Sequence, residues 1–166
     1  MESKLLNKKM IGTVDFKKFS GDHLENFIDY IKNYLNDHKD KEIDILIGTD
    51  SQNKGAKTAY STVIVLYQHG HGGHCIFRRW NTKREKVKNV RLLKEVEESI
   101  NVANQIVEAG LPKPKYIDLD INPNPRFKSY EVYQTAKGWV ESLGYDVRFK
   151  TIAPLATTAA DWMVRK

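Results

Sequence analysis

The order of the predicted secondary-structure elements constrains the fold of this chain most. Three segments rich in β-branched and aromatic residues come first, and helical and strand patterns then alternate to the end of the sequence. Turn-forming and glycine-rich stretches separate the first three segments, so we expect an antiparallel meander. The sequence therefore predicts an α/β fold with a five-stranded mixed sheet. The predicted strands are 44–47, 59–67, 75–80, 116–121 and 145–149, and the predicted helices are 88–109, 129–143 and one from Thr157 or Thr158 to Trp162.

One domain is expected to account for all 166 residues, of which 40% are hydrophobic. Residues 1–40 form a predicted helical N-terminal extension, and residues 43–166 form the core. Within the extension, helical spacing of apolar residues follows the capping stretch Ser20–Asp22 and ends near His38. In the core, Ser129 is the predicted cap of the 129–143 helix.

Charge and composition limit the classes of function. The net charge of +6 and the pI of 9.3 favour a polyanionic partner such as nucleic acid. The single Cys75 cannot form an internal disulfide, and the first ten residues contain no apolar segment typical of a secretory signal. No apolar run approaches the ~20 residues that cross a bilayer. We therefore expect a soluble protein of the cytoplasm that does not insert into membranes.

Asp50 follows the first predicted strand in the stretch IGTDSQ (Ile47 to Gln52). A carboxylate at the end of a buried strand is costly unless a cation or hydrogen-bond donors meet it. One interpretation is a turn, because Asp-Ser followed by Asn53, Lys54 and Gly55 is good turn chemistry. The other is a metal ligand, which requires further carboxylates from distant parts of the chain.

The first long helix offers Glu95, Glu97 and Glu98 as candidate ligands. At ~100° per residue, Glu95 lies on one flank of the apolar face and Glu97 lies on the other. Glu98 points to the opposite side, where we expect it to be solvated. The pattern favours Glu95 as the ligand, with Glu97 and a half-exposed surface glutamate as alternatives.

Two aspartates alternate with apolar residues in YIDLDIN (Tyr116 to Asn122), although aspartate is disfavoured in strands. Asp120 is the better candidate ligand because it lies at the carboxyl end of the strand, where ligands gather in open sheets. Asp118 is expected near the middle of the sheet or solvated at its edge, with a supporting role near the site as an alternative. Asp161 follows two alanines in the last helix and either belongs to the site or complements the helix dipole.

Eight basic residues and one acid occupy the stretch from Arg78 to Lys94. Contact with phosphates is the functional interpretation, with Arg79, Arg84, Lys88 and Arg91 as candidates, and a solvated connector is the alternative. Trp80 fits either the core or a base-stacking role. The spacing of His69, His71, His74 and Cys75 matches no standard zinc pattern, and the chain has no nucleotide-binding phosphate loop.

Several of these stretches together resemble one known family. They are IGTDSQ (47–52), RLLKE (91–95), LDINP (119–123), Lys128 with Ser129, Lys150, and Ala159-Ala160-Asp161. The chain is similar to the YkuK-type family of ribonuclease H-like proteins, and the order of elements is that of the ribonuclease H-like fold. The resemblance implies a metal-dependent nuclease-like site with Asp50, Glu95, Asp120 and Asp161 as its acids, and it adds Lys128 and Lys150 to the candidate phosphate contacts. Thr151 departs from the family pattern, in which proline is expected after the lysine.

The predicted function is that of a nuclease that hydrolyses phosphodiester bonds. Carboxylate oxygens are the preferred ligands of Mg²⁺ and Mn²⁺, and two such ions can activate a water and clamp a phosphate. The alternative is a non-catalytic nucleic-acid-binding module, but a binder of polyanions gains nothing from four converging acids. RNA, DNA and hybrid substrates, and a monomer or a homodimer, all stay open at this point.

Overall fold

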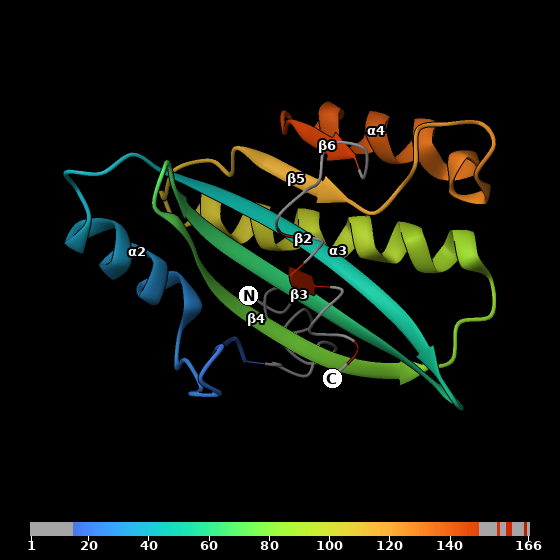
Figure 1. The fold of residues 1–166 in the computed structure, drawn as a ribbon, viewed down its shortest axis with the longest axis horizontal. Helices are drawn as coiled ribbons and strands as arrows, with labels where there is room; N and C mark the ends of the chain where they lie inside the picture. Colours follow the sequence, from blue (N-terminus) through green and yellow to red (C-terminus); the bar gives the residue numbers. More distant parts are fainter. Residues whose placement is uncertain (1–14, 150–155, 157–158, 161–164, 166) are drawn as a thin grey trace, which may run out of the picture.

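A six-stranded mixed sheet forms the centre of the molecule (Figure 1). The computed structural model describes residues 15–149, 156, 159–160 and 165. Its strands run in the order β1-β4-β3-β2-β5-β6, with β2, β3 and β4 antiparallel and β2, β5 and β6 parallel. The predicted α/β class and meander are confirmed. The strands are β1 (Lys17–Lys18), β2 (Ile43–Lys54), β3 (Lys57–Gln68), β4 (Gly72–Lys83), β5 (Tyr116–Leu119) and β6 (Val147–Phe149).

The sixth strand, β1, was not predicted. It is two lysines long and pairs with β4 at the edge of the sheet. Lysine has low strand propensity, so its sequence gives no strand signal. Its pairing with β4, and a single bridge from Lys17 to His23, define it.

The strand β2 is much longer than the predicted segment 44–47. It pairs with β3 from Ile43 opposite Gln68 to Lys54 opposite Lys57, and the chain reverses at Gly55 and Ala56. Gly55 has a φ of 56°, a left-handed conformation that glycine adopts without strain. The turn interpretation was therefore wrong for Asp50, which lies inside the strand.

The segments α2, α3, η1 and α4 accompany the sheet within residues 15–149, and two predicted caps were wrong. The helix α2 (Phe27–Asp37) begins at Asn26, whose side chain accepts hydrogen bonds from the next turn, while Ser20 donates to Asp22 before it. The helix α3 (Lys88–Glu108) agrees with its prediction. Ser129 caps no helix; it lies in the 3₁₀ segment η1 (Lys128–Val132), which precedes α4 (Tyr133–Ser142).

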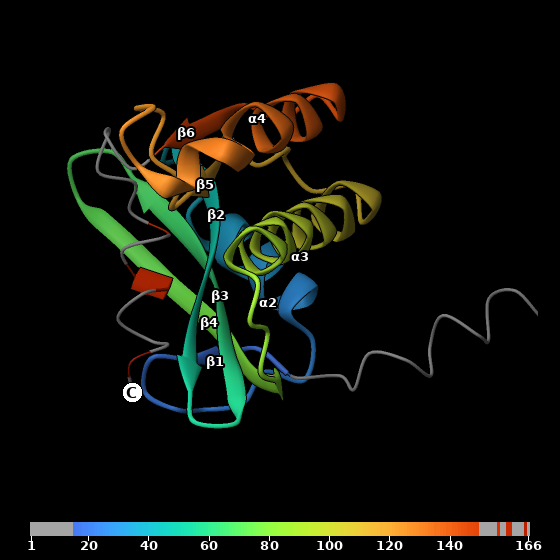
Figure 2. The same ribbon diagram turned by 90° about the vertical axis from the view of Figure 1, so that its right-hand side faces the viewer.

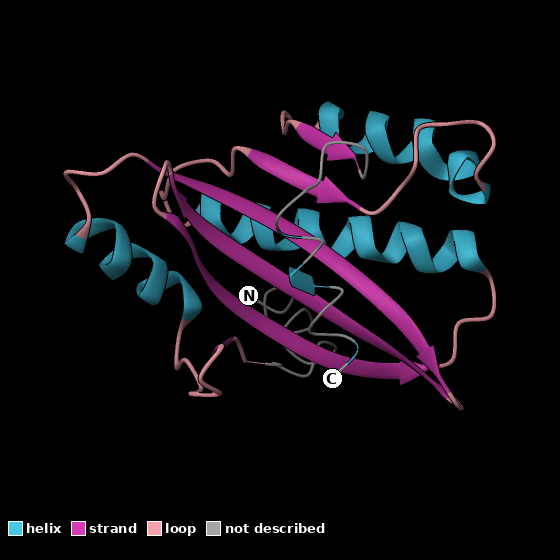
Figure 3. Cartoon of the chain, viewed as in Figure 1, coloured by secondary structure: helices cyan, strands magenta, loops and turns pink. Residues whose placement is uncertain are grey.

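The helices α2, α3 and α4 pack on one face of the sheet (Figure 2; Figure 3). The larger core lies there and includes Ile31 of α2, Val96 of α3 and Val140 of α4. A smaller core on the other face packs Ala156 and Ala160 against Leu46, Val63 and Val65. Thr157, Thr158 and Trp162, which bound the predicted last helix, lie outside the described residues.

Candidate acidic site

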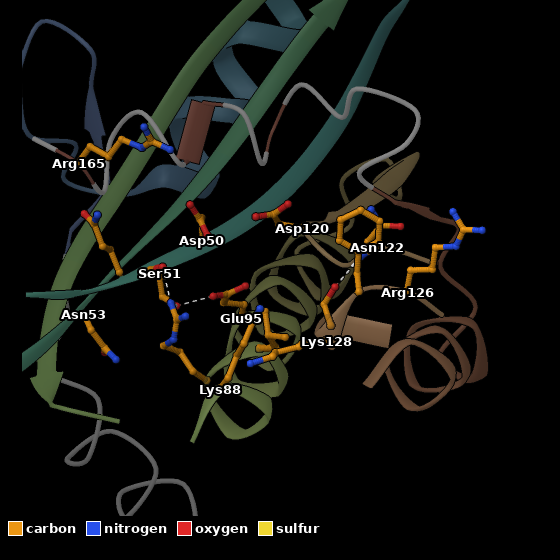
Figure 4. A pocket seen from close by; sticks show the side chains of 15 residues that line it. Asp50, Ser51, Asn53, Lys88, Glu95, Asp120, Asn122, Arg126, Lys128 and Arg165 are labelled. Atoms are coloured by element: carbon orange, nitrogen blue, oxygen red, sulfur yellow. Dashed lines mark hydrogen bonds between the residues drawn. The ribbon is translucent and has the colours of Figure 1, made fainter. Parts of the chain in front are cut away.

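Three carboxylates from three elements meet at the carboxyl end of β5. Asp50 lies in β2, Glu95 lies in α3, and Asp120 follows β5 directly. The strands β2 and β5 are parallel neighbours, and the pairing of Gly48 with Asp118 places Asp50 beside Asp120. Figure 4 shows the three side chains directed into a common space. They line a pocket of about 610 Å³ together with Ser51, Gln52, Asn53, Lys88, Arg91, Leu92, Asn122, Arg126, Phe127, Lys128, Ser129 and Arg165.

The residues on either side of Asp50 attach β2 to α3. Thr49 accepts a hydrogen bond from Ser99 at 2.9 Å, and its hydroxyl lies 2.9 Å from that of Thr62. Ser51 donates a hydrogen bond to Glu95. Because side chains alternate along a strand, these bonds leave Asp50 on the opposite face. The alternation thus positions Glu95 through Ser51 and directs Asp50 toward Asp120.

Glu95 is buried and lies close to other negative charges. Its exposed fraction is 3%, and that of Asp50 is 8%. Burial raises the pKa of Glu95 well above its usual range, and the charges of Asp50 and Asp120 raise it further, against the opposing effects of Ser51 and Arg91. The Arg91 guanidinium also fixes Ser51, donating to its carbonyl at 2.6 Å and to its hydroxyl at 2.9 Å.

The donor atoms of these three acids are of the type that a hard divalent cation binds. The set consists of carboxylate oxygens, which Mg²⁺ and Mn²⁺ prefer over sulfur or nitrogen. A bound cation offsets the mutual repulsion that raises the pKa of Glu95. The chemistry of the donor set therefore agrees with the metal type expected from the sequence.

The comparison with family models decides the family. The model described as Ribonuclease H-like matches residues 26–165. The chain belongs to the ribonuclease H-like family. A comparison with curated proteins finds no match. Among the helices that the structure describes, none is long and apolar enough to cross a membrane.

The other glutamates of α3 lie outside the site of this ribonuclease H-like chain. Glu97 is half-buried and pairs with Lys94 at 2.7 Å. Glu98 was expected to be solvated, but it is 8% exposed and pairs with Arg78 at 2.9 Å and Lys94 at 3.0 Å. That prediction was wrong because Arg78 reaches α3 from β4. Helical periodicity describes only the residues of the helix itself and does not predict this contact.

Asp118 is fully buried and makes structural contacts. Its carboxylate accepts two hydrogen bonds from Arg148 of β6, at 2.8 and 2.9 Å, and one from the backbone N–H of Ala156 at 3.0 Å. Burial raises the pKa of Asp118, against the effect of Arg148. Of the two expected positions, the one within the sheet is confirmed and the solvated edge is not, and the side chain does not line the pocket. Asp118 instead joins β5, β6 and the segment at Ala156.

Five cationic residues surround the acids. Lys88, Arg91 and Lys128 were candidates from the sequence, whereas Arg126 and Arg165 were missed. Arg126 belongs to the loop after Asp120, so its position in the sequence next to a candidate acid could have identified it. Arg165 gave none, because nothing in the sequence showed where the chain end lies. Two further candidates, Lys150 and the acid Asp161, lie outside the described residues.

The remaining two basic candidates do not line the pocket. Arg79 lies in β4 opposite Ser61, two strands away from β2. Arg84 donates to the carbonyl of Gly55 at 2.6 Å, at the β2–β3 turn. Trp80 stacks on Tyr60, with ring centroids 5.4 Å apart. Trp80 thus contacts another aromatic side chain of the sheet, and it too does not line the pocket.

A second acidic group lies at the start of β2, where Glu42, Asp44 and His69 bring ligand atoms within 4.8 Å of one another. Asp44 is six residues before Asp50, or about 20 Å at ~3.3 Å per residue along the strand. Its carboxylate contacts Lys115 at 2.7 Å and His69 at 2.6 Å. Asp44 is therefore part of an ion-pair network with Lys115 and His69.

The remaining histidines have separate partners. The Nδ1 atom of His71 lies 3.0 Å from the carbonyl of His69, and the Nε2 atom of His74 lies 2.7 Å from the hydroxyl of Tyr30. Cys75 packs near the smaller core on the other face. These positions give no support to the zinc interpretation.

The ion pairs of Asp44 predict a pH-dependent contribution to stability. Burial alone would raise the pKa of Asp44, but Lys115 and His69 together lower it. The stabilisation is therefore present above the unfolded pKa of about 3.9 and is lost as the pH falls through the lower folded value. We expect Asp44→Asn to lower the melting temperature at pH 7 by a few degrees and to change it less at pH 2.5. Equal differences at both pH values would contradict this. The matched control is Asp37→Asn at the exposed end of α2.

Proposed function

We propose that this ribonuclease H-like protein is a metal-dependent nuclease that hydrolyses phosphodiester bonds in nucleic acid. The observation that carries the proposal is the convergence of Asp50, Glu95 and Asp120 in one pocket with cationic residues around it. The similarity of the sequence to the YkuK-type group adds Asp161 as a fourth acid. The protein acts as one domain, as a monomer or a homodimer. It acts in the cytoplasm, a reducing compartment that fits its single cysteine, Cys75.

The acids are proposed to hold Mg²⁺ or Mn²⁺. A bound divalent cation lowers the pKa of a water and stabilises negative charge on a phosphate. The chain itself supplies orientation: Ser51 donates a hydrogen bond to the Glu95 carboxylate, and Arg91 in turn donates to the Ser51 hydroxyl, so the position of Glu95 is fixed by its neighbours. Lys88, Arg126 and Lys128, all exposed at the pocket, are placed to bind phosphates on either side of the acids.

A non-catalytic nucleic-acid-binding module is the second candidate. The cationic residues around the pocket would serve such a protein equally well. The buried carboxylates favour the nuclease, because three converging acids repel a polyanion unless a cation neutralises them. An acid as buried as Glu95 also destabilises the fold above its pKa, which a binding role does not require.

Incubation with labelled single-stranded, duplex, hybrid and branched nucleic acids tests the proposal. We expect cleavage of at least one substrate in Mg²⁺ or Mn²⁺ and none in excess chelator. Binding without cleavage of any substrate, in either metal, would favour the binding module. The same panel determines whether RNA, DNA or a hybrid is the substrate.

The cationic residues predict a salt-dependent contribution to binding. Replacing Lys88, Arg126 and Lys128 together with glutamine should weaken single-strand binding. The slope of log K against log[salt] should also fall by about 0.7 for each phosphate that is no longer neutralised. Mn²⁺ affinity should change little, because none of the three is among the proposed metal ligands. The measurement is a salt titration with a labelled oligonucleotide.

The control for this variant removes the same charge elsewhere. Lys32, Lys39 and Lys41 are exposed lysines in and after α2 and do not line the pocket. Replacing these three with glutamine should leave the slope nearly unchanged. Equal effects of the two triple variants would show that net charge, and not the pocket, determines binding.

A further inference from the structure

Phe127 is an exposed aromatic side chain at the acidic pocket. It is 53% exposed and is the one aromatic residue among the described residues that line the pocket. It belongs to neither hydrophobic core, so the packing of the fold does not explain its position. The exposed ring at the edge of a polar pocket is available to stack against a ligand.

The loop that carries Phe127 is fixed by its own hydrogen bonds. The Asn122 side chain accepts from the N–H of Asn124 at 2.9 Å, and the Asn124 side chain accepts from the N–H of Arg126 at 3.0 Å. The N–H of Phe127 donates to the Asn124 carbonyl at 3.1 Å, and the Ser129 hydroxyl accepts from the N–H of Asn122 at 3.1 Å. A partner that contacts this loop therefore binds a largely ordered surface, which reduces the entropy lost on binding.

The neighbours of Phe127 indicate what that partner is. Arg126 and Lys128 flank it in sequence, are exposed, and line the same pocket. An aromatic face between two cations, beside carboxylates suited to a metal, matches the parts of a nucleotide: a base that stacks and phosphates that pair with cations. A base offers its face only where it is unstacked, which excludes the interior of a continuous duplex.

We propose that Phe127 is a stacking platform for an unpaired nucleobase next to the acidic pocket. This inference rests on the proposed nuclease function and specifies its substrate class: nucleic acid with single-stranded or otherwise unpaired nucleotides at the point of cleavage. Arg126 and Lys128 contact the phosphates that flank the stacked base. The fixed loop directs the adjoining phosphate toward Asp50, Glu95 and Asp120.

The test measures binding of a single-stranded oligonucleotide that contains 2-aminopurine, with Ca²⁺ present in place of the catalytic metals. Stacking on Phe127 quenches the fluorescence of the probe. Phe127→Ala should lose that quenching and weaken binding by about 5-fold to 150-fold, the range for one aromatic–base stack. Phe127→Tyr should retain both signals, whereas Phe127→Leu, which is apolar but not aromatic, should resemble alanine.

Two controls separate stacking from general effects. Phe19 is 47% exposed and does not line the pocket, so Phe19→Ala should bind the probe as the wild type does. Binding of a blunt duplex should be nearly equal for the wild type and Phe127→Ala. If Phe127→Ala keeps the affinity and quenching of the wild type, or if Phe127→Leu binds as tightly as Phe127→Tyr, the stacking platform is refuted.

The outcomes also distinguish this inference from the proposed nuclease function. Stacking that depends on Phe127, in a protein that cleaves none of the substrates, would support the platform and refute the nuclease. Metal-dependent cleavage with no effect of Phe127→Ala on single-strand binding would support the nuclease and refute the stacking platform.

Discussion

Asp50→Asn and Asp120→Asn should each reduce metal-dependent cleavage by at least about a hundredfold. Removing a residue that only supports a metal ligand reduces activity by at most about that factor, so the loss of a ligand itself should exceed it. Without metal, either variant should melt at the same temperature as the wild type or slightly higher. The reason is electrostatic: each change removes one of the charges that raise the pKa of Glu95. A catalytic acid in a repulsive cluster is therefore distinguished from a structural acid by the sign of its effect on stability.

Thermal melting with and without Mn²⁺ measures both parts of this prediction. A metal that binds only the folded state stabilises it by about 2.7 kcal/mol at a hundred times its Kd, so the wild type should shift upward and Asp50→Asn should not. Asp44→Asn is a matched control from the other acidic group, and its Mn²⁺ shift should equal that of the wild type. Absence of any shift in the wild type, or early unfolding of Asp50→Asn without metal, would identify Asp50 as structural.

The control also decides between the two acidic groups. Glu42, Asp44 and His69 bring their ligand atoms close together, but Lys115 already neutralises Asp44, and both Glu42 and His69 are exposed. In the pocket, by contrast, the charges of Asp50 and Asp120 raise the pKa of Glu95 more than Arg91 lowers it, so a cation gains more there. A Mn²⁺ shift absent in Asp44→Asn and kept in Asp50→Asn would place the metal at the start of β2.

Local patterns in the sequence contained much of the fold and the candidate site. The helix α3 has a long apolar face, and its periodicity favoured Glu95 over Glu97 and Glu98; of these three, Glu95 is the one that lines the pocket. The succession of elements predicted the meander of β2, β3 and β4, and the stretch YIDLDIN placed Asp120 at the carboxyl end of the strand that forms β5. The signals behind these inferences lie within one helix, within one strand, or in strands that follow one another in the chain.

Three outcomes that the sequence did not predict depend on partners distant in the sequence. Glu98 is buried because Arg78 approaches from β4, and Asp118 is buried because Arg148 approaches from β6. Ser129 bonds to the loop at Asn122 and therefore does not cap a helix. In each case the hydrogen-bond or charge partner lies at least seven positions away, and no local pattern encodes it.

Asp118→Asn should have the largest effect on stability, lowering the free energy of unfolding by about 2–4 kcal/mol. Removing one partner of a buried ion pair typically destabilises by about 3–5 kcal/mol, and we expect less here because the Arg148 side chain is 19% exposed. Two effects combine: the Arg148 guanidinium loses its charged partner, and the N–H of Ala156 loses part of its acceptor. Urea unfolding of the wild type and the variant measures the difference.

The double variant Asp118→Asn with Arg148→Met determines whether the unpaired charge is the cause. Removing both charges of a buried pair is far less destabilising than removing one, so the double variant should recover a large part of the stability that the single variant lacks. Asp118→Asn should also reduce the Mn²⁺ shift less than Asp50→Asn does, since Asp118 does not line the pocket. If the single variant is as stable as the wild type, the contacts with Arg148 and Ala156 contribute little, and Asp118 is not what joins the segment at Ala156 to the sheet.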